Sequence, residues 1–156
     1  MIEDLEIKKI LETTKIIAMI GVSSIKKDEK PTNIVRRPSN IVMKYLLEFG
    51  YRVIPINPYS KESTIQGEKV LPNLDDVSER IDMVNVFRPS IETPDIARQA
   101  IKIGAKTLWL QYGIQNEEAQ KITNQAKVNY VANRCIKQEY QRLFLKTNPV
   151  FPALKS

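Results

Sequence analysis

The feature that most constrains the fold of this 156-residue chain is a regular alternation of short apolar runs with longer amphipathic segments. The run at 16–20, Ile-Ile-Ala-Met-Ile, is apolar throughout and ends in Gly21, which is typical of a central strand buried on both faces. Further strands are predicted at 51–56, 82–87, 107–110 and 128–132. Helical spacing and stop signals predict helices at 2–12, 38–49, 96–103, 116–126 and 136–145.

Strands that alternate with helices of this length form a parallel sheet, and right-handed crossovers place helices on both of its faces. We therefore predict an α/β, three-layer, doubly wound Rossmann-like fold whose five parallel strands follow the order 3-2-1-4-5. Residues 1–147 would form a single domain, and residues 148–156, with two prolines, a loose tail. Ligands bind such sheets at the carboxyl ends of the strands, beside the topological switch point. The segments after Gly21, Asn57, Phe87 and Gln111 should therefore meet in one cleft.

Composition narrows the class of protein. A single cysteine rules out an internal disulfide, no apolar run approaches the roughly 18 residues of a membrane span, and the first residues are acidic, unlike a signal peptide. We expect a cytoplasmic protein without a membrane partner. The net charge of +6 comes from basic residues spread along the chain, with no dense basic helix. This distribution disfavours nucleic acid and suits a phosphorylated small molecule.

The loop that begins with Gly21, Val22 and Ser23 stands where a Rossmann-like protein binds phosphates. Glycine permits close approach of the backbone, but a lone glycine falls short of the full dinucleotide fingerprint. The loop continues to Arg37 and carries five basic and two acidic side chains, a net charge of +3: Lys26, Lys27, Lys30, Arg36 and Arg37 against Asp28 and Glu29. Multiple phosphates would bind such a loop through charge-assisted hydrogen bonds.

The end of the second strand carries no acidic residue. NAD sites place a carboxylate there to hold the ribose hydroxyls, whereas this chain has Asn57 and Pro58, followed by Lys61. The pattern argues against NAD and permits a phosphorylated ribose. Simple turn chemistry for Asn57-Pro58 is the alternative.

The sequence resembles the stand-alone CoA-binding domain family, relatives of the CoA-binding domain of the succinyl-CoA synthetase α subunit, from Ile16 to about Leu143. The similarity rests on the order and spacing of these segments: Ile20-Gly21-Val22-Ser23, Arg37-Pro38-Ser39, Tyr45-Leu46, residues 50–58, 82–88, 104–111 and 113–119, and Asn133-Arg134-Cys135.

The resemblance implies coenzyme A or an acyl-CoA as the ligand. It implies that the backbone of Gly21, Val22 and Ser23 meets the pyrophosphate, with Arg37 and Ser39 close by. Further residues are assigned along the same cleft: Asn57, Pro58 and Lys61 toward the adenosine part, Phe87 and Arg88 over the cleft, and Gln111, Tyr112 and Gly113 toward the pantetheine arm.

The chain departs from the family pattern in two places. An insertion centred on Lys26 to Val35 separates Ser23 from Arg37, and we predict that it forms a mobile basic flap over the phosphates. The family more often has an aspartate where Asn133 stands. Trp109 is expected in the core, and Cys135 either as a small buried residue or as a thiol that faces the cleft.

The chain has no histidine, which removes Ser–His or Cys–His nucleophile pairs and the phosphohistidine step of the synthetase relatives. The candidate acids and bases do not cluster at the strand ends: Asp75, Asp76, Asp82, Glu92 and Asp95. We therefore expect a binding, sensor or carrier protein and no metal site. An NAD(P)-dependent oxidoreductase and a basic module that docks nucleic acid or a protein are the alternatives. Self-association and the choice between free and acylated coenzyme A stay open.

Overall fold

The computed structural model describes residues 2–23, 26–27, 34–35 and 38–145. Five parallel strands form the main sheet: β1 (Ile16–Ile20), β4 (Arg52–Ile56), β7 (Met83–Val86), β8 (Thr107–Leu110) and β9 (Asn129–Val131). The longer helices are α1 (Asp4–Thr13), α2 (Pro38–Glu48), α3 (Thr93–Lys102), α4 (Glu117–Gln125) and α5 (Ile136–Tyr140), which Gln141–Leu145 extend as a π-helical turn. The predicted α/β fold is confirmed.

Short elements complete the chain: β2 (Lys26–Lys27), β3 (Ile34–Val35), β5 (Thr64–Ile65), β6 (Glu68–Lys69), η1 (Leu74–Asp76) and η2 (Ser90–Glu92). The antiparallel pair β2–β3 holds the two ends of the insertion together. Most of the predicted flap between these strands lies outside the described residues, as does the predicted tail at 148–156.

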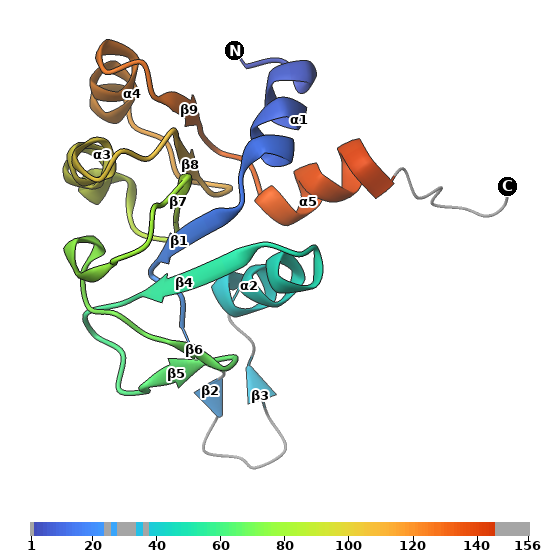
Figure 1. Ribbon diagram of the computed structural model, residues 1–156, viewed down its shortest axis with the longest axis vertical. Helices are drawn as coiled ribbons and strands as arrows, with labels where there is room; N and C mark the ends of the chain where they lie inside the picture. The colour runs from blue at the N-terminus through green and yellow to red at the C-terminus, as the bar shows by residue number, and fades with distance from the viewer. Residues whose placement is uncertain (1, 24–25, 28–33, 36–37, 146–156) are drawn as a thin grey trace, which may run out of the picture.

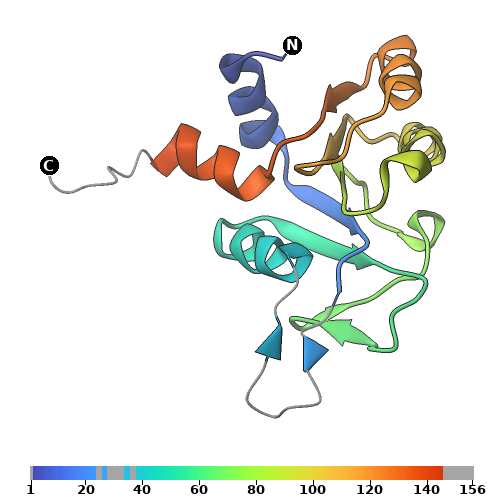
Figure 2. The ribbon, with the colours of Figure 1, turned by 180° about the vertical axis from the view of Figure 1, so that it is seen from behind.

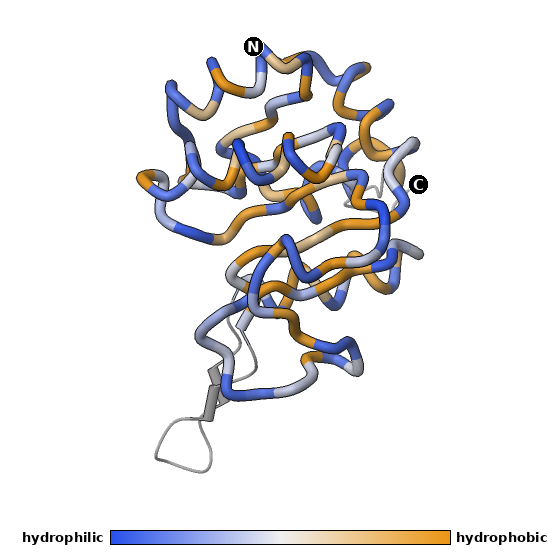
Figure 3. Tube along the Cα trace, turned by 60° about the vertical axis from the view of Figure 1, so that its left-hand side comes forward, coloured by the Kyte–Doolittle hydropathy of each residue, from blue (hydrophilic) through white to orange (hydrophobic). Residues whose placement is uncertain are grey.

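The helices cover the sheet on both sides (Figures 1 and 2). On one face α1, α2 and α5 pack on a core that includes Ile17, Met19 and Trp109, and on the other α3, α4 and η1 pack on Val84 and Leu108. Every residue of β7 and β8 is buried, which explains why these strands carry apolar side chains on both faces; Asn85 and Thr107 are the buried polar exceptions. Figure 3 shows the strands as the hydrophobic centre of the molecule.

The predicted strand order 3-2-1-4-5 is wrong. The observed order is β4-β1-β7-β8-β9. The second main strand along the chain, β4, therefore lies at the edge of the sheet, and the third, β7, pairs with the other side of β1. The outer edge of β4 is occupied by Leu71, whose N–H donates to the Pro55 carbonyl (3.0 Å) and whose carbonyl accepts from the Asn57 N–H (2.9 Å). Proline has no N–H to offer a further strand on that side, and an edge position tolerates it.

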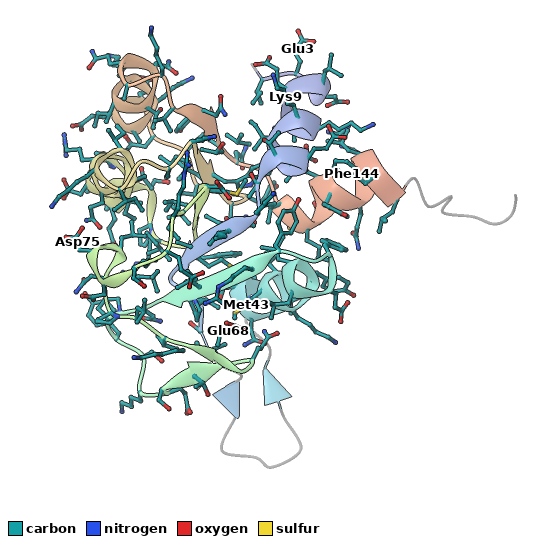
Figure 4. All side chains as sticks on the ribbon, in the orientation of Figure 1. Glu3, Lys9, Met43, Glu68, Asp75 and Phe144 are labelled. Atoms are coloured by element: carbon teal, nitrogen blue, oxygen red, sulfur yellow. The ribbon has the colours of Figure 1, made fainter. Side chains whose placement is uncertain are left out.

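Ion pairs join the first and last helices. Arg142 donates two hydrogen bonds to Asp4 (both 2.8 Å) and also pairs with Glu139 (2.9 Å). The Arg142 guanidinium holds the pKa of the Asp4 carboxyl below its usual value. Phe144 lies on the turn after α5, with the Lys8 ammonium 5.6 Å from its ring centre (Figure 4). The π-helical turn thus fixes α1 against α5.

Within the described ranges, no helix is long and apolar enough to cross a membrane.

Candidate functional site

The switch point of the sheet lies between β1 and β7. The helix after β1, α2, packs on one face, and the helix after β7, α3, packs on the opposite face. The two connections diverge at the carboxyl ends of these neighbouring strands, which leaves a crevice between them. The new strand order moves the switch point to the β1–β7 boundary, but the predicted loop after Gly21 still borders it.

Gly21 is required where β1 ends. Its φ of +90° is unfavourable for other residues, and a Cβ at this position would stand 2.4 Å from the Phe87 carbonyl oxygen. The loops after β1 and β7 approach this closely because the Phe87 N–H donates to the Ile20 carbonyl (2.8 Å) and the Gly21 N–H to the Ile56 carbonyl (2.9 Å). The start of the candidate phosphate loop is therefore fixed to both neighbouring strands.

Side chains at the start of α2 hold the next part of the loop. The Ser23 N–H donates to Ser39 Oγ (3.1 Å), and Asn40 Nδ2 donates to the Ser23 carbonyl (2.9 Å). Gln66, at the turn between β5 and β6, donates to the Asn40 carbonyl (2.8 Å). Serine and asparagine are residue types that cap helices, but α2 begins at Pro38, so Ser39 and Asn40 lie in its first turn and bind the loop instead.

Asn57 joins the ends of β1 and β4. Its Nδ2 donates to the Val22 carbonyl (3.0 Å), and its Oδ1 accepts from the Tyr59 N–H (2.8 Å). An ionised aspartate could accept from Tyr59 but could not donate to Val22. The amide at this position therefore has a structural reason: it holds the phosphate loop and the turn after β4 at the same time.

A cavity of about 150 Å³ opens beside this loop, between the ends of β1, β4 and β7. Its walls include Gly21, Asn57 and Pro58, together with Leu74 from η1 and Ile96 from α3. This volume holds one part of a nucleotide, since whole ligand pockets span roughly 300–1,000 Å³.

Arg88 and Glu92 form an ion pair on the wall of this cavity, with hydrogen bonds of 3.0 and 2.7 Å. Each group stabilises the charged form of the other, so the pKa of Glu92 is lowered and that of Arg88 is raised. Tyr59 is 75% exposed and its ring centre lies 5.8 Å from the Arg88 guanidinium carbon. The predicted cleft arginine is thus at the cleft, but it is held by a carboxylate and an aromatic ring.

The segment after β8 divides into a buried anchor and an exposed loop. Gln111 is only 3% exposed, donates to Asn85 Oδ1 (2.6 Å) and accepts from the Ile136 N–H (3.4 Å). Tyr112 is exposed, and the Gly113 N–H donates to Asn133 Oδ1 (2.7 Å). Gln111 therefore supports the loop from below, while Tyr112 and Gly113 stay accessible to a ligand.

The remaining predicted positions fall in different places. Phe87 is half-buried against the core, and Lys61 is exposed beyond the turn after β4, outside the cavity wall. Arg37 lies outside the described residues. Trp109 is fully buried, as predicted, and Cys135 is half-buried against the core.

Sequence reasoning missed residues that reach the site only through tertiary contacts. Leu74, Ile96 and Gln66 arrive from three separate segments, and nothing in their local sequence marks them. Asn40 has a signal, because it stands next to Ser39 at the start of α2, but that signal is the same as that of a helix cap.

Two of the candidate acids, Asp82 and Asp95, lie outside the cavity wall. Asp82 accepts from the Lys15 and Ile16 N–H groups (both 3.0 Å). These contacts lie at the amino end of β1, whereas the cavity lies at the carboxyl ends of the strands. Asp95 pairs with Arg98 on the exposed face of α3. Over the described ranges, no group of three or more candidate ligand side chains could hold a metal ion.

Comparison with known proteins identifies the family of this site. Residues 15–141 match the sequence model of the CoA binding domain. The chain therefore belongs to the CoA-binding domain family, and the resemblance seen in the sequence is confirmed.

Individual relatives share both sequence and fold. The uncharacterized protein YneT of Bacillus subtilis is 35% identical over 132 residues, which cover 85% of this chain and 90% of the relative. A hypothetical protein from Pyrococcus horikoshii is 40% identical, with a TM-score of 0.78 and coverage of 91% and 92% of the two chains. A Thermus thermophilus protein is 34% identical, also with a TM-score of 0.78, and covers 92% and 100%.

Proposed function

We propose that this protein binds coenzyme A, free or acylated, at the carboxyl ends of its parallel strands. The observation that carries the proposal is the fixed loop Gly21–Ser23, which stands at the switch point and is tied to β4, β7 and α2 by the hydrogen bonds described above. Because the loop is preorganised, it loses little conformational entropy when it binds a pyrophosphate. Membership of the CoA-binding domain family supports the same ligand.

In this proposal each part of the ligand has its own place. The pyrophosphate meets the partly exposed backbone of Gly21 and Ser23 near Ser39, with Arg37 supplying charge, while the buried Val22 supports the loop. The adenine occupies the cavity beside Asn57 and Pro58, where the side chains of Leu74 and Ile96 give the flat base apolar contacts. The pantetheine arm crosses the end of β8 over Tyr112 and Gly113. Lys61, exposed beyond the turn after β4, is the residue that we assign to the phosphate on the ribose.

We propose a binding, sensor or carrier role in preference to catalysis. Glu92, the acidic residue on the cavity wall, is paired with Arg88 and stays ionised because this pair lowers its pKa. A carboxylate held in this way is a poor proton donor near neutral pH. The sequence also contains no histidine that could act as a general base.

A ligand panel on the full chain tests this proposal. Native mass spectrometry of the purified protein, alone and after addition of coenzyme A or NADH, should show an added mass for coenzyme A and none for NADH. Tight binding of NADH with no coenzyme A adduct would favour the oxidoreductase alternative. Incubation of acetyl-CoA with the protein should leave the thioester intact, and its consumption would show an enzyme.

A further inference from the structure

A second cavity lies beyond the end of the proposed coenzyme A site. It has a volume of about 640 Å³ and is lined by residues of β9 and the chain after it, of the start of α4, and of the chain before α1. Its lining is mainly polar and includes Gln115, Gln120, Asn133 and Arg134, with Glu117 also on the wall. Of these side chains, the site described above uses only Asn133, which holds the Gly113 N–H.

The loop after β8 leads to the second cavity, which Gln115 and Asn116 of this loop line. Asn133 borders the second cavity, and it accepts from the Gly113 N–H (2.7 Å) and donates its own N–H to the Ile114 carbonyl (3.0 Å). Gly113 is the position over which the pantetheine arm is proposed to pass. A group that continues along this loop therefore enters the second cavity.

The length of the pantetheine arm fits this path. Three strand intervals separate β1 from β9, which is about 14 Å at the usual spacing of about 4.8 Å. Between the pyrophosphate oxygen and the sulfur, the pantetheine arm has roughly as many bonds as the backbone of four amino-acid residues. Four residues in an extended chain span about 14 Å, so the extended arm spans about the same distance. A thiol whose pyrophosphate is bound at the loop after β1 can thus present its acyl group at β9.

The charges of the cavity disfavour an acyl group that carries a negative charge. The Arg134 guanidinium is paired with Glu139 (2.9 Å), and Glu139 also pairs with Arg142 (2.9 Å). Glu117 adds a negative charge on the cavity wall. An acyl group that ends in a carboxylate would meet a compensated arginine and an opposing carboxylate, so it gains little from this site.

The hydrogen-bonding groups of the cavity suit a neutral polar acyl group. The side-chain amides of Gln115 and Gln120 can each donate and accept. Of the side chains in the described part of the chain, Glu139 alone hydrogen-bonds the Arg134 guanidinium, which has five N–H groups. A hydroxyl would find partners here, whereas a long aliphatic chain would meet only Ile2 and Ala132 as aliphatic wall residues.

We propose that this cavity binds the acyl group of short, hydroxyl-bearing acyl-CoA thioesters. The inference rests on the proposed coenzyme A site and adds the class of acyl group to it.

Isothermal titration of the full chain with free coenzyme A, butyryl-CoA and 3-hydroxybutyryl-CoA tests it. We expect the hydroxylated thioester to bind about three- to tenfold more tightly than butyryl-CoA, the gain from one or two net hydrogen bonds. Gln120→Leu should reduce this preference and leave the affinity for free coenzyme A unchanged. The matched control is Gln125→Leu, an exposed position on the same helix outside the cavity, which should keep the preference.

The outcomes separate the two proposals. Binding of free coenzyme A with equal affinities for both thioesters would overturn the acyl site and leave the coenzyme A site standing. A preference that Gln120→Leu and Gln125→Leu alter equally would also overturn it. Failure of all three ligands to bind would overturn the coenzyme A site itself.

Discussion

Gly21 combines two constraints at one residue, a positive φ and a Cβ position already occupied by the Phe87 carbonyl. Gly104 has a similar φ of +81°, but a Cβ there would meet nothing within 4 Å, and it lies at the amino end of β8. We expect Gly104→Ala to cost about 1 kcal/mol of unfolding free energy through backbone strain. Gly21→Ala should cost about 1–3 kcal/mol more, because the clash forces the two loops apart.

Urea unfolding of both variants measures this difference, and titration with coenzyme A should show lost binding for Gly21→Ala alone. Equal unfolding free energies and equal affinities in the two variants would mean that the close approach at Phe87 has no role.

A substitution at Asn57 tests whether its side-chain amide holds the phosphate loop to the end of β4. In Asn57→Asp the carboxylate faces the Val22 carbonyl at about the same separation, with no hydrogen to share. We expect the affinity for coenzyme A to fall roughly tenfold, since the phosphate loop loses its tie to β4. Asn124→Asp, the same change at an exposed position on α4, is the control for the added charge. Equal affinities in the two variants would contradict the role given to Asn57.

At the scale of elements, the Arg142 ion pairs predict a pH-dependent contact between α1 and the π-helical turn. The folded-state pKa of Asp4 is lowered, so its contribution is present above the pKa of the unfolded chain and is lost as the pH falls through the folded-state pKa. Asp4→Asn should therefore lower the melting temperature at neutral pH, and the difference from wild type should vanish in acid. Thermal melts across this range measure it. A difference that persists unchanged in acid would contradict the assignment.

The elements themselves could be predicted closely from the sequence. All five main strands begin and end within one residue of their predicted bounds, because continuous apolar runs in a doubly covered sheet are bounded by polar residues. Their order could not be predicted in the same way, since it depends on which side of β1 each crossover returns to. Pro55 was the available signal: a strand with an internal proline belongs at a sheet edge, which excludes an order with this strand inside.

The candidate site could be predicted in part, because the ends of the strands could be predicted. Gly21, Asn57 and Arg88 follow directly from strand ends, and the structure places all three on one cavity wall. The hydrogen bond between Ser39 and Ser23 could not be predicted, because it joins two different segments of the chain. The ion pair of Arg88 with Glu92 is local, at i,i+4 spacing, but such spacing alone does not distinguish it from an arginine left available to a phosphate.

The whole molecule is a parallel sheet whose helices change faces at β1 and β7, and this change creates the crevice in which the site lies. A phosphate loop at that crevice, in a member of the CoA-binding domain family, leads to a salt prediction. A small ligand with few phosphates should show a modest loss of affinity with added salt, whereas a nucleic-acid partner would show a steep one. Titrations of coenzyme A and of duplex DNA at two salt concentrations compare the slopes.

The central claim is that coenzyme A binds this chain at the loop Gly21–Ser23. Isothermal titration of the wild-type protein with coenzyme A, with Gly21→Ala measured in parallel, tests it most directly. The claim predicts saturable heat with one ligand per chain for the wild type and its loss in the variant. Absence of heat with the folded wild-type protein at high micromolar coenzyme A, or equal binding by a folded Gly21→Ala variant, would contradict it.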